Sequence, residues 1–331
     1  MMQSVRTAVR AIALVIASLC CLATHHPACA DEFPPRTIRI LIPFSPGGPN
    51  DVIGRPLADK MAELLGTTIV IENRPGAQGR SATQAVARSP PDGATILMTT
   101  GSHVANQVLY ANLAYDALAD FTALTLLAES YGVALVTRPD LPAGNIRELI
   151  ALAKLSPGKY TYGHPGVGNA NHIAGELLQK ICDVQLLAVP YKGSGSYVTD
   201  IISGQVDLGF MSTAVATPNV QSRLLKAFAV TGPARAPSLP DVPTMIESGY
   251  PDFNWTGYFG LFLPAGLPAD RVARLNQAAV EAIRTPLLRK VLADSGLALV
   301  GSTPEAFARY LAKDLAHQRA VAQRIGLREQ P

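Results

Sequence analysis

Short apolar strands alternate with amphipathic helices along this 331-residue chain, and the alternation starts a second time partway along. In the first unit we expect strands at residues 38–42, 68–72 and 94–99, with helices between them. The helix after the first strand carries Ile53, Leu57, Met61 and Leu64 at helical spacing. Strands separated by helices indicate a mostly parallel sheet with helices on both faces, which is an α/β fold.

The same alternation restarts at Val133. Further strands are expected at residues 133–137, 160–162, 185–189, 206–210 and 227–230. A proline-rich stretch over 233–251 indicates an irregular connection. The tail then returns to a strand at 258–263 and three helices, so it forms either a third unit or an addition to the first.

A mature chain of about three hundred residues exceeds what one core usually holds, so we expect two lobes. Segments 126–136 and 254–263 have the composition of strands that cross between them. Lobe 1 would then comprise residues 31–130 and 256–331, and lobe 2 residues 131–255. A hinge between two open sheets places a ligand at the carboxyl ends of the strands.

The N-terminus has the pattern of a secretory signal peptide over residues 1–30. Arg6 and Arg10 precede an apolar run, and Ala28-Cys29-Ala30 supplies the small residues of a cleavage site. We expect cleavage after Ala30 and export to the periplasm; an uncleaved anchor is the alternative, although the run is short for a membrane span. The mature chain keeps only Cys182, which excludes an intramolecular disulfide.

Charge and motif content argue against several classes of protein. With 28 basic and 25 acidic residues and no basic run, nothing favours nucleic-acid or membrane-surface binding. His103, His164 and His172 lack the spacing of metal ligands, and Gly193-Ser194-Gly195-Ser196 is not a G-x-S-x-G elbow. We therefore expect no metal, no cofactor and no catalysis. A secreted enzyme whose catalytic groups come from distant positions stays open as an alternative.

Two glycine-rich turns are the candidate binding elements. The first, PFSPGGPND at 43–51, joins a strand to a helix, and YTYGHPGVGNANH at 160–172 repeats this arrangement. Such turns leave backbone N–H groups free to bind anions, carboxylates above all. Two of them facing each other would form a clamp. The alternative is that each turn only connects its strand to its helix.

Eight segments, spread in order over nearly the whole mature chain, resemble a known family. They are PFSPGGPNDVIGR (43–55), VIENRPGAQG (70–79), PPDGATILM (90–98), YDALADFTAL (115–124), YGHPGVGNANHIAGE (162–176), VPYKGSGSYVTDIISGQVDLGF (189–210), LPDVPTMIESGYPDFNW (239–255) and GLFLPAGLP (260–268). The pattern is similar to the Bug family, the periplasmic solute-binding receptors of tripartite tricarboxylate transporters. The resemblance implies a type II-like, two-lobed periplasmic binding protein fold that closes around a small carboxylate-bearing solute.

The resemblance also implies which residues bind the solute, largely through backbone amides and ordered waters. These residues are Phe44, Ser45, Gly47, Gly48, Asp51, Gly101, Ser102, His103, His164, Gly166, Val167, Gly168, Asn169, Ser212 and Thr213. The glycines allow a ligand to approach the backbone closely. Asp51 would repel a polyacid but could pair with an amine or hydroxyl of the ligand.

This chain departs from the family pattern at three places. His164 and Asn169 replace small hydroxyl residues, and Arg80-Ser81-Ala82 replaces Asn-Ile-Gly. Dicarboxylates, tricarboxylates, acidic amino acids and aromatic acids all stay compatible, with a slight preference for a ligand that also carries a donor group. The expected partners are the permease subunits of the transporter, with a monomeric receptor. Presentation of the closed form to a membrane sensor kinase is the alternative role.

Overall fold

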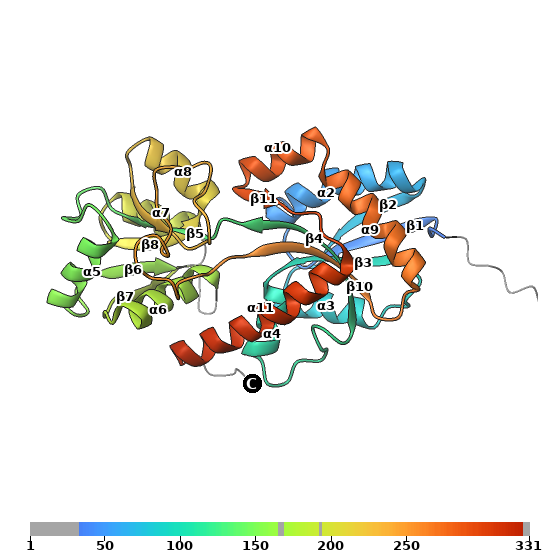
Figure 1. Cartoon of the computed structure of the whole chain (residues 1–331), viewed down its shortest axis with the longest axis horizontal. Coiled ribbons are helices and arrows are strands. Elements are labelled where there is room, and N and C mark those ends of the chain that lie inside the picture. The colour runs from blue at the N-terminus through green and yellow to red at the C-terminus, as the bar shows by residue number, and fades with distance from the viewer. Residues whose placement is uncertain (1–32, 165–168, 192–193, 327–331) are drawn as a thin grey trace, which may run out of the picture.

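The structure is a computed structural model that describes residues 33–164, 169–191 and 194–326. Two β-sheets flanked by helices form two lobes that lie side by side and are joined by extended segments (Figure 1). The larger sheet has the strand order β11-β4-β10-β3-β1-β2, and the smaller has the order β7-β6-β8-β5-β9. This arrangement confirms the expected two-lobed α/β fold. The predicted signal peptide lies outside the described residues.

The strands are β1 (Thr37–Ile42), β2 (Thr68–Asn73), β3 (Thr95–Thr100), β4 (Phe121–Ser130), β5 (Val133–Thr137), β6 (Thr161–His164), β7 (Leu187–Pro190), β8 (Leu208–Ser212), β9 (Lys226–Val230), β10 (Tyr258–Pro264) and β11 (Leu297–Leu299). The α-helices are α2 (Pro49–Leu65), α3 (Arg80–Ala87), α4 (Ser102–Leu109), α5 (Ile146–Leu155), α6 (Ala170–Cys182), α7 (Ser194–Ile202), α8 (Thr213–Gln221), α9 (Ala269–Ile283), α10 (Pro286–Asp294) and α11 (Pro304–Ile325).

Both faces of the larger sheet are buried. In β1, Ile40 and Ile42 belong to an apolar cluster with α2, α9 and α10, whereas Leu41 belongs to a second cluster with α3, α4 and α11. Successive side chains of a strand point to opposite faces, so the consecutive buried residues Ile40, Leu41 and Ile42 need cover on both sides of the sheet, whereas Arg39 is exposed. The smaller sheet is covered in the same way, by α5 and α6 in one cluster and by α7 and α8 in another.

The expectation of mostly parallel sheets is wrong, because both sheets are mixed. β1 is parallel to β2 and β3, and β6 is parallel to β7 and β8. β10 is antiparallel to β3 and β4, and β5 is antiparallel to β8 and β9. The reason is the crossing of the chain, which enters a new lobe just before β5 and again just before β10. Both strands therefore start at the edge of their sheet that faces the other lobe. Because β1, β3, β6 and β8 end at this edge, β5 and β10 run in the opposite direction.

The tail adds to the larger sheet and does not form a third unit. β10 pairs between β3 and β4, and β11 pairs with the outer side of β4. The last helix, α11, packs on β4 and α4 and also contacts α6 of the smaller-sheet lobe. At its far end, Arg324 forms an ion pair with Asp252 at 3.2 Å. Helix α11 therefore ties the two lobes together along one side (Figure 1).

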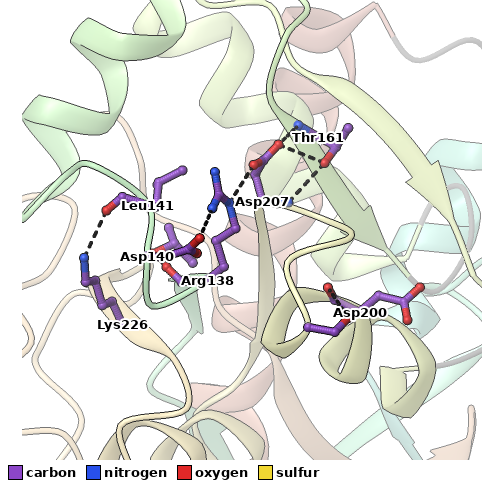
Figure 2. A network of polar contacts seen from close by, with 9 residues as sticks. Arg138, Asp140, Leu141, Thr161, Asp200, Asp207 and Lys226 are labelled. Carbon is purple, nitrogen blue, oxygen red and sulfur yellow. Dashed lines mark hydrogen bonds and ion pairs between the residues drawn. The ribbon is translucent and has the colours of Figure 1, made fainter.

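A polar network holds the smaller sheet at the end away from the larger one (Figure 2). Asp207 accepts hydrogen bonds from Nε of Arg138 at 2.9 Å and from the backbone N–H of Thr161 at 2.8 Å. Arg138 also pairs with Asp140 at 2.6 Å. These contacts join the ends of β5, β6 and β8 that lie opposite Ser212, so they fix the sheet at the end away from the other lobe.

The lobes also touch directly at Gly296 and Thr213. Gly296 follows α10 with a left-handed backbone (φ +69), and an added Cβ there would collide with the hydroxyl of Thr213, at the start of α8. Thr213 is only 2 % exposed. A side chain at position 296 is therefore incompatible with this approach of the two lobes.

We predict that Gly296→Ala separates the lobes, whereas Gly66→Ala does not. Both glycines end a helix in the left-handed region, so each substitution should cost about 1–2 kcal/mol of unfolding free energy. An added Cβ at Gly66 would have no neighbouring atom within 4 Å, so Gly66→Ala introduces the backbone strain without the collision. Small-angle scattering should give a larger radius of gyration for Gly296→Ala alone. Equal scattering from both folded variants would contradict the contact.

Candidate solute-binding cleft

A cavity of about 550 Å³ lies between the two lobes. From the larger-sheet lobe it is lined by Phe44, Thr100, Gly101, Ser102, Ala105, Asn106, Leu109, Tyr258, Phe259 and Gln318. Asn169, Ala170 and Ile173 line it from the smaller-sheet lobe, and the crossing segments contribute Ser130, Trp255, Thr256 and Gly257. Its volume falls within the range of small-molecule sites.

The start of α4 forms one wall of the cavity. β3 ends at Thr100, Gly101 makes the turn, and the Ser102 hydroxyl lies 3.2 Å from that of Thr100. The N-cap residue Gly101 makes no side-chain cap, and the Thr100 hydroxyl accepts a hydrogen bond from the Ser102 N–H at 3.4 Å. Further N–H groups of the first turn are available to an anion. The cavity-lining residues of α4 recur every three or four positions, which places one face of the helix towards the solute.

The start of α6 forms the opposite wall. The side-chain oxygen of Asn169 accepts a hydrogen bond from the Asn171 N–H at 3.0 Å and so caps the helix. The indole Nε1 of Trp255 donates to the carbonyl oxygen of Ala170 at 3.1 Å, which holds the ring against this end of α6. A second helix N-terminus therefore approaches the cavity, which suits a negatively charged group.

Asp51 organises the first glycine turn. Its carboxylate accepts hydrogen bonds from the Gly47 N–H at 3.0 Å, from Arg55 at 2.8 and 2.9 Å and from Asn73 at 3.1 Å. The Arg55 hydrogen bond is the main reason that the pKa of Asp51 lies below its usual value. Asn73 also donates to the carbonyl oxygen of Phe44 at 3.1 Å. The hydrogen bonds of Asp51 and Asn73 therefore hold Phe44, which lines the cavity, in place.

The structure brings four of the predicted site residues to the cavity: Phe44, Gly101, Ser102 and Asn169. Other predicted residues of the first turn, Ser45, Gly47, Gly48 and Asp51, lie close to Phe44 but are not part of the lining. Their roles in binding stay predictions.

Three other predicted residues of the smaller-sheet lobe are described but are not part of the lining: His164, Ser212 and Thr213. His164 ends β6 and is 2 % exposed, and its ring lies at a centroid distance of 4.5 Å from that of His172, tilted by 54°. Ser212 is exposed before α8, and Thr213 lies at the contact between the lobes. Gly166, Val167 and Gly168 lie outside the described residues, so their binding role stays a prediction.

His103 lies behind the cavity in the core. Its Nε2 donates to the carbonyl oxygen of Ala117 at 2.8 Å, and its ring packs on Phe121 and Phe262 at centroid distances of 4.7 and 4.4 Å. Burial lowers the pKa of His103 to about 4, against opposing effects of the Ala117 hydrogen bond and Asp116. This position suits a neutral, structural histidine.

Sequence reasoning missed the apolar part of the lining. Leu109, Ile173, Trp255 and Tyr258 are all less than a tenth exposed, and all line the cavity. A helical-face analysis started at Ser102 would have reached Leu109, and one started at Asn169 would have reached Ile173. Gln318, on the last helix, has no such local signal.

Across residues 33–164, 169–191 and 194–326, no group of three or more histidine, cysteine, aspartate or glutamate side chains could hold a metal ion. Within the same ranges, no helix combines the length and the apolar character needed to cross a membrane.

Two lobes around a cavity at the ends of their strands define a solute-binding protein of the periplasmic type. The model of the tripartite tricarboxylate transporter family receptor matches residues 53–327. The chain belongs to this family, which confirms the expected Bug-type receptor class. A curated relative, the "UPF0065 protein in tcbD-tcbE intergenic region" of Pseudomonas sp. strain P51, is 36 % identical over 279 residues, covering 84 % of this chain and 83 % of the relative.

Solved structures of similar proteins agree with the family. The periplasmic binding protein BugD is 32 % identical, with a TM-score of 0.75 over 90 % of this chain and 100 % of BugD. MatC from Rhodopseudomonas palustris, solved with malate, is also 32 % identical (TM-score 0.73, 87 % and 99 % covered). An adipate-bound protein of R. palustris is 29 % identical (TM-score 0.77, 90 % and 100 % covered).

We predict that His103→Gln flattens the acid dependence of stability. The folded-state pKa of about 4 lies below the unfolded value of 6.5, so the unfolded chain binds the proton first. The contribution of His103 is therefore complete above pH 6.5 and is lost as the pH falls towards 4, by up to about 3 kcal/mol. Urea unfolding of both proteins from pH 7 to pH 4.5 measures this: the free energy of unfolding should fall less steeply with decreasing pH in His103→Gln than in the unsubstituted protein. Parallel curves for both proteins would contradict the burial of a neutral imidazole.

Proposed function

We propose that this chain is an exported receptor that captures a small carboxylate-bearing solute between its lobes and delivers it to the membrane subunits of a tripartite tricarboxylate transporter. The observation that carries this proposal is the cavity of about 550 Å³ between the lobes, with the starts of α4 and α6 on opposite walls. Helix N-termini stabilise anions through free N–H groups and the helix dipole. Family membership and the malate and adipate bound by two relatives support the same class of ligand.

In this proposal the signal peptide is removed after Ala30, and the mature chain works as a monomer. Lobe 1 is formed by residues 31–130 and 256–331, and lobe 2 by residues 131–255. The carboxylate contacts N–H groups of both lobes only when they are closed, so binding shifts the population towards the closed form. The permease subunits would recognise that closed form.

The proposal is tested by a thermal-shift screen of residues 31–331. The protein is first unfolded and refolded to remove any solute that it carried through purification. It is then screened against dicarboxylates, tricarboxylates, amino acids and aromatic acids. A ligand at about one hundred times its Kd should add about 2.7 kcal/mol of stability, which shifts Tm by several degrees. A folded protein that responds to no carboxylate in the panel would contradict the proposal.

A cavity-filling variant tests where the solute binds. Ala105 lines the cavity on α4, whereas Ala87 is a partly buried alanine of α3 outside it. We predict that Ala105→Phe weakens binding of any hit by about tenfold or more, because the added ring takes the solute's space. Ala87→Phe should leave the affinity unchanged. Titration calorimetry of both variants, with circular dichroism as a check of folding, measures this; equal affinities would place the solute elsewhere.

A further inference from the structure

A buried tyrosine hydroxyl at the wall of the cavity has no partner in the part of the chain that the structure describes. It belongs to Tyr258 of β10, whose side chain lines the cavity and is 2 % exposed. Phe307 and Tyr310 pack edge to face on the ring, at centroid distances of 5.8 and 5.3 Å, and hold it in place. A buried hydroxyl without a partner destabilises the folded protein, and a polar group of the solute would relieve this on binding.

The Tyr258 hydroxyl is an uncharged hydrogen-bond donor. Burial, with a smaller effect of the nearby Asp314, raises the pKa of Tyr258 well above its usual value, so the phenol keeps its proton. A neutral phenol donates one hydrogen bond and accepts others. The solute group that meets it must therefore have an oxygen or nitrogen that accepts.

Gln318 of α11 supplies an acceptor to the same cavity. Its Nε2 donates to Asp314 at 2.8 Å. Because a carboxylate only accepts hydrogen bonds, this contact determines which end of the amide faces Asp314 and leaves Oε1 at the other end. Among the described residues, no donor is bonded to this oxygen, and the Gln318 side chain lines the cavity. The amide therefore offers its carbonyl oxygen to the solute.

Tyr258 and Gln318 meet at Gly101, the residue that precedes α4. An added Cβ at Gly101 would lie 3.5 Å from Cε1 of Tyr258 and 3.9 Å from Nε2 of Gln318. The N–H of Ala105 bonds to the carbonyl oxygen of Gly101 at 2.9 Å, so N–H groups between these two residues remain for a carboxylate. The donor of Tyr258 and the acceptor of Gln318 therefore lie beside the carboxylate position.

We propose that Tyr258 and Gln318 select a solute with a hydroxyl group on the carbon next to its carboxylate, that is, a 2-hydroxycarboxylate. This selectivity rests on the proposed function and narrows its ligand class. The solute hydroxyl accepts a hydrogen bond from Tyr258 and donates one to Oε1 of Gln318, while the carboxylate binds at the start of α4. A hydroxyl does both at once, whereas an ammonium group only donates and a keto oxygen only accepts. The same pair serves mono-, di- and tricarboxylates.

Position isomers of hydroxy acids test the inference by titration calorimetry on the refolded mature protein. One series compares 2-hydroxybutyrate with 3-hydroxybutyrate, butyrate and 2-aminobutyrate. The other compares 2-hydroxyglutarate with 3-hydroxyglutarate, glutarate and glutamate. In a series that binds, we expect the 2-hydroxy acid to bind about tenfold more tightly than each of the other three, because it alone satisfies both Tyr258 and Gln318.

The outcomes separate the inference from the proposed function. Equal affinities for a 2-hydroxy acid and its parent acid would overturn the inference and leave the receptor function intact. Tighter binding of the 3-hydroxy isomer or of the amino acid would do the same. A hit of the thermal-shift screen that lacks a 2-hydroxyl and binds more tightly than every 2-hydroxy acid would also overturn it. Failure of every carboxylate would overturn both.

Two tyrosines that pack on each other provide a matched pair of variants. Tyr258 lines the cavity, whereas Tyr310 lines a separate hollow. Tyr258→Phe should lower the affinity for the 2-hydroxy acid about tenfold, to that of the parent acid, and leave the parent acid's affinity unchanged. Gln318→Met should weaken the preference in the same way, and Tyr310→Phe should retain it.

The melting temperature distinguishes a lost contact from a folding defect. Because Tyr258→Phe removes a hydroxyl that has no partner among the described residues, Tm of the solute-free protein should stay the same or rise. Full preference for the 2-hydroxy acid in Tyr258→Phe would contradict the inference, as would equal losses for the 2-hydroxy acid and its parent.

Discussion

The direction of the strands at the edge between the two sheets determines where this protein can bind a solute. β1, β3, β6 and β8 all end at that edge, so helices that follow them begin there and present their N-termini to the space between the lobes. β5 and β10 begin at the same edge because the chain has just crossed from the other lobe. The direction of the strands at this edge thus explains both how the chain joins the lobes and where the lobes share a site.

Much of the fold follows from local sequence patterns. The apolar runs and the glycine turns identify elements whose bounds agree with the structure within a few residues. Asn145 and Thr303, whose side chains are of types that favour helix starts, cap α5 and α11. The parallel character of the sheets was overestimated, because the pairing of β5 and β10 depends on the crossing of the chain and not on the composition of those strands.

The site could be predicted only where it is continuous with a turn. Ser102 and His103 are neighbours in sequence, yet consecutive helical residues point about 100° apart, so one lines the cavity and the other packs in the core. Trp255 and Gln318 reach the cavity through tertiary packing, which no local pattern encodes. Trp255 belongs to the apolar part of the cavity lining. The sequence therefore indicates a carboxylate on the solute but carries little information on the rest of it.

The central claim is that the lobes close on a carboxylate. Pulsed EPR between spin labels at Val215→Cys on α8 and Leu287→Cys on α10 tests it, because both side chains are exposed and lie on different lobes (Figure 1). The account predicts a longer or broader distance distribution in the solute-free protein and a shorter, narrower one when a carboxylate is bound. Calorimetrically proven binding with an unchanged distribution would contradict it.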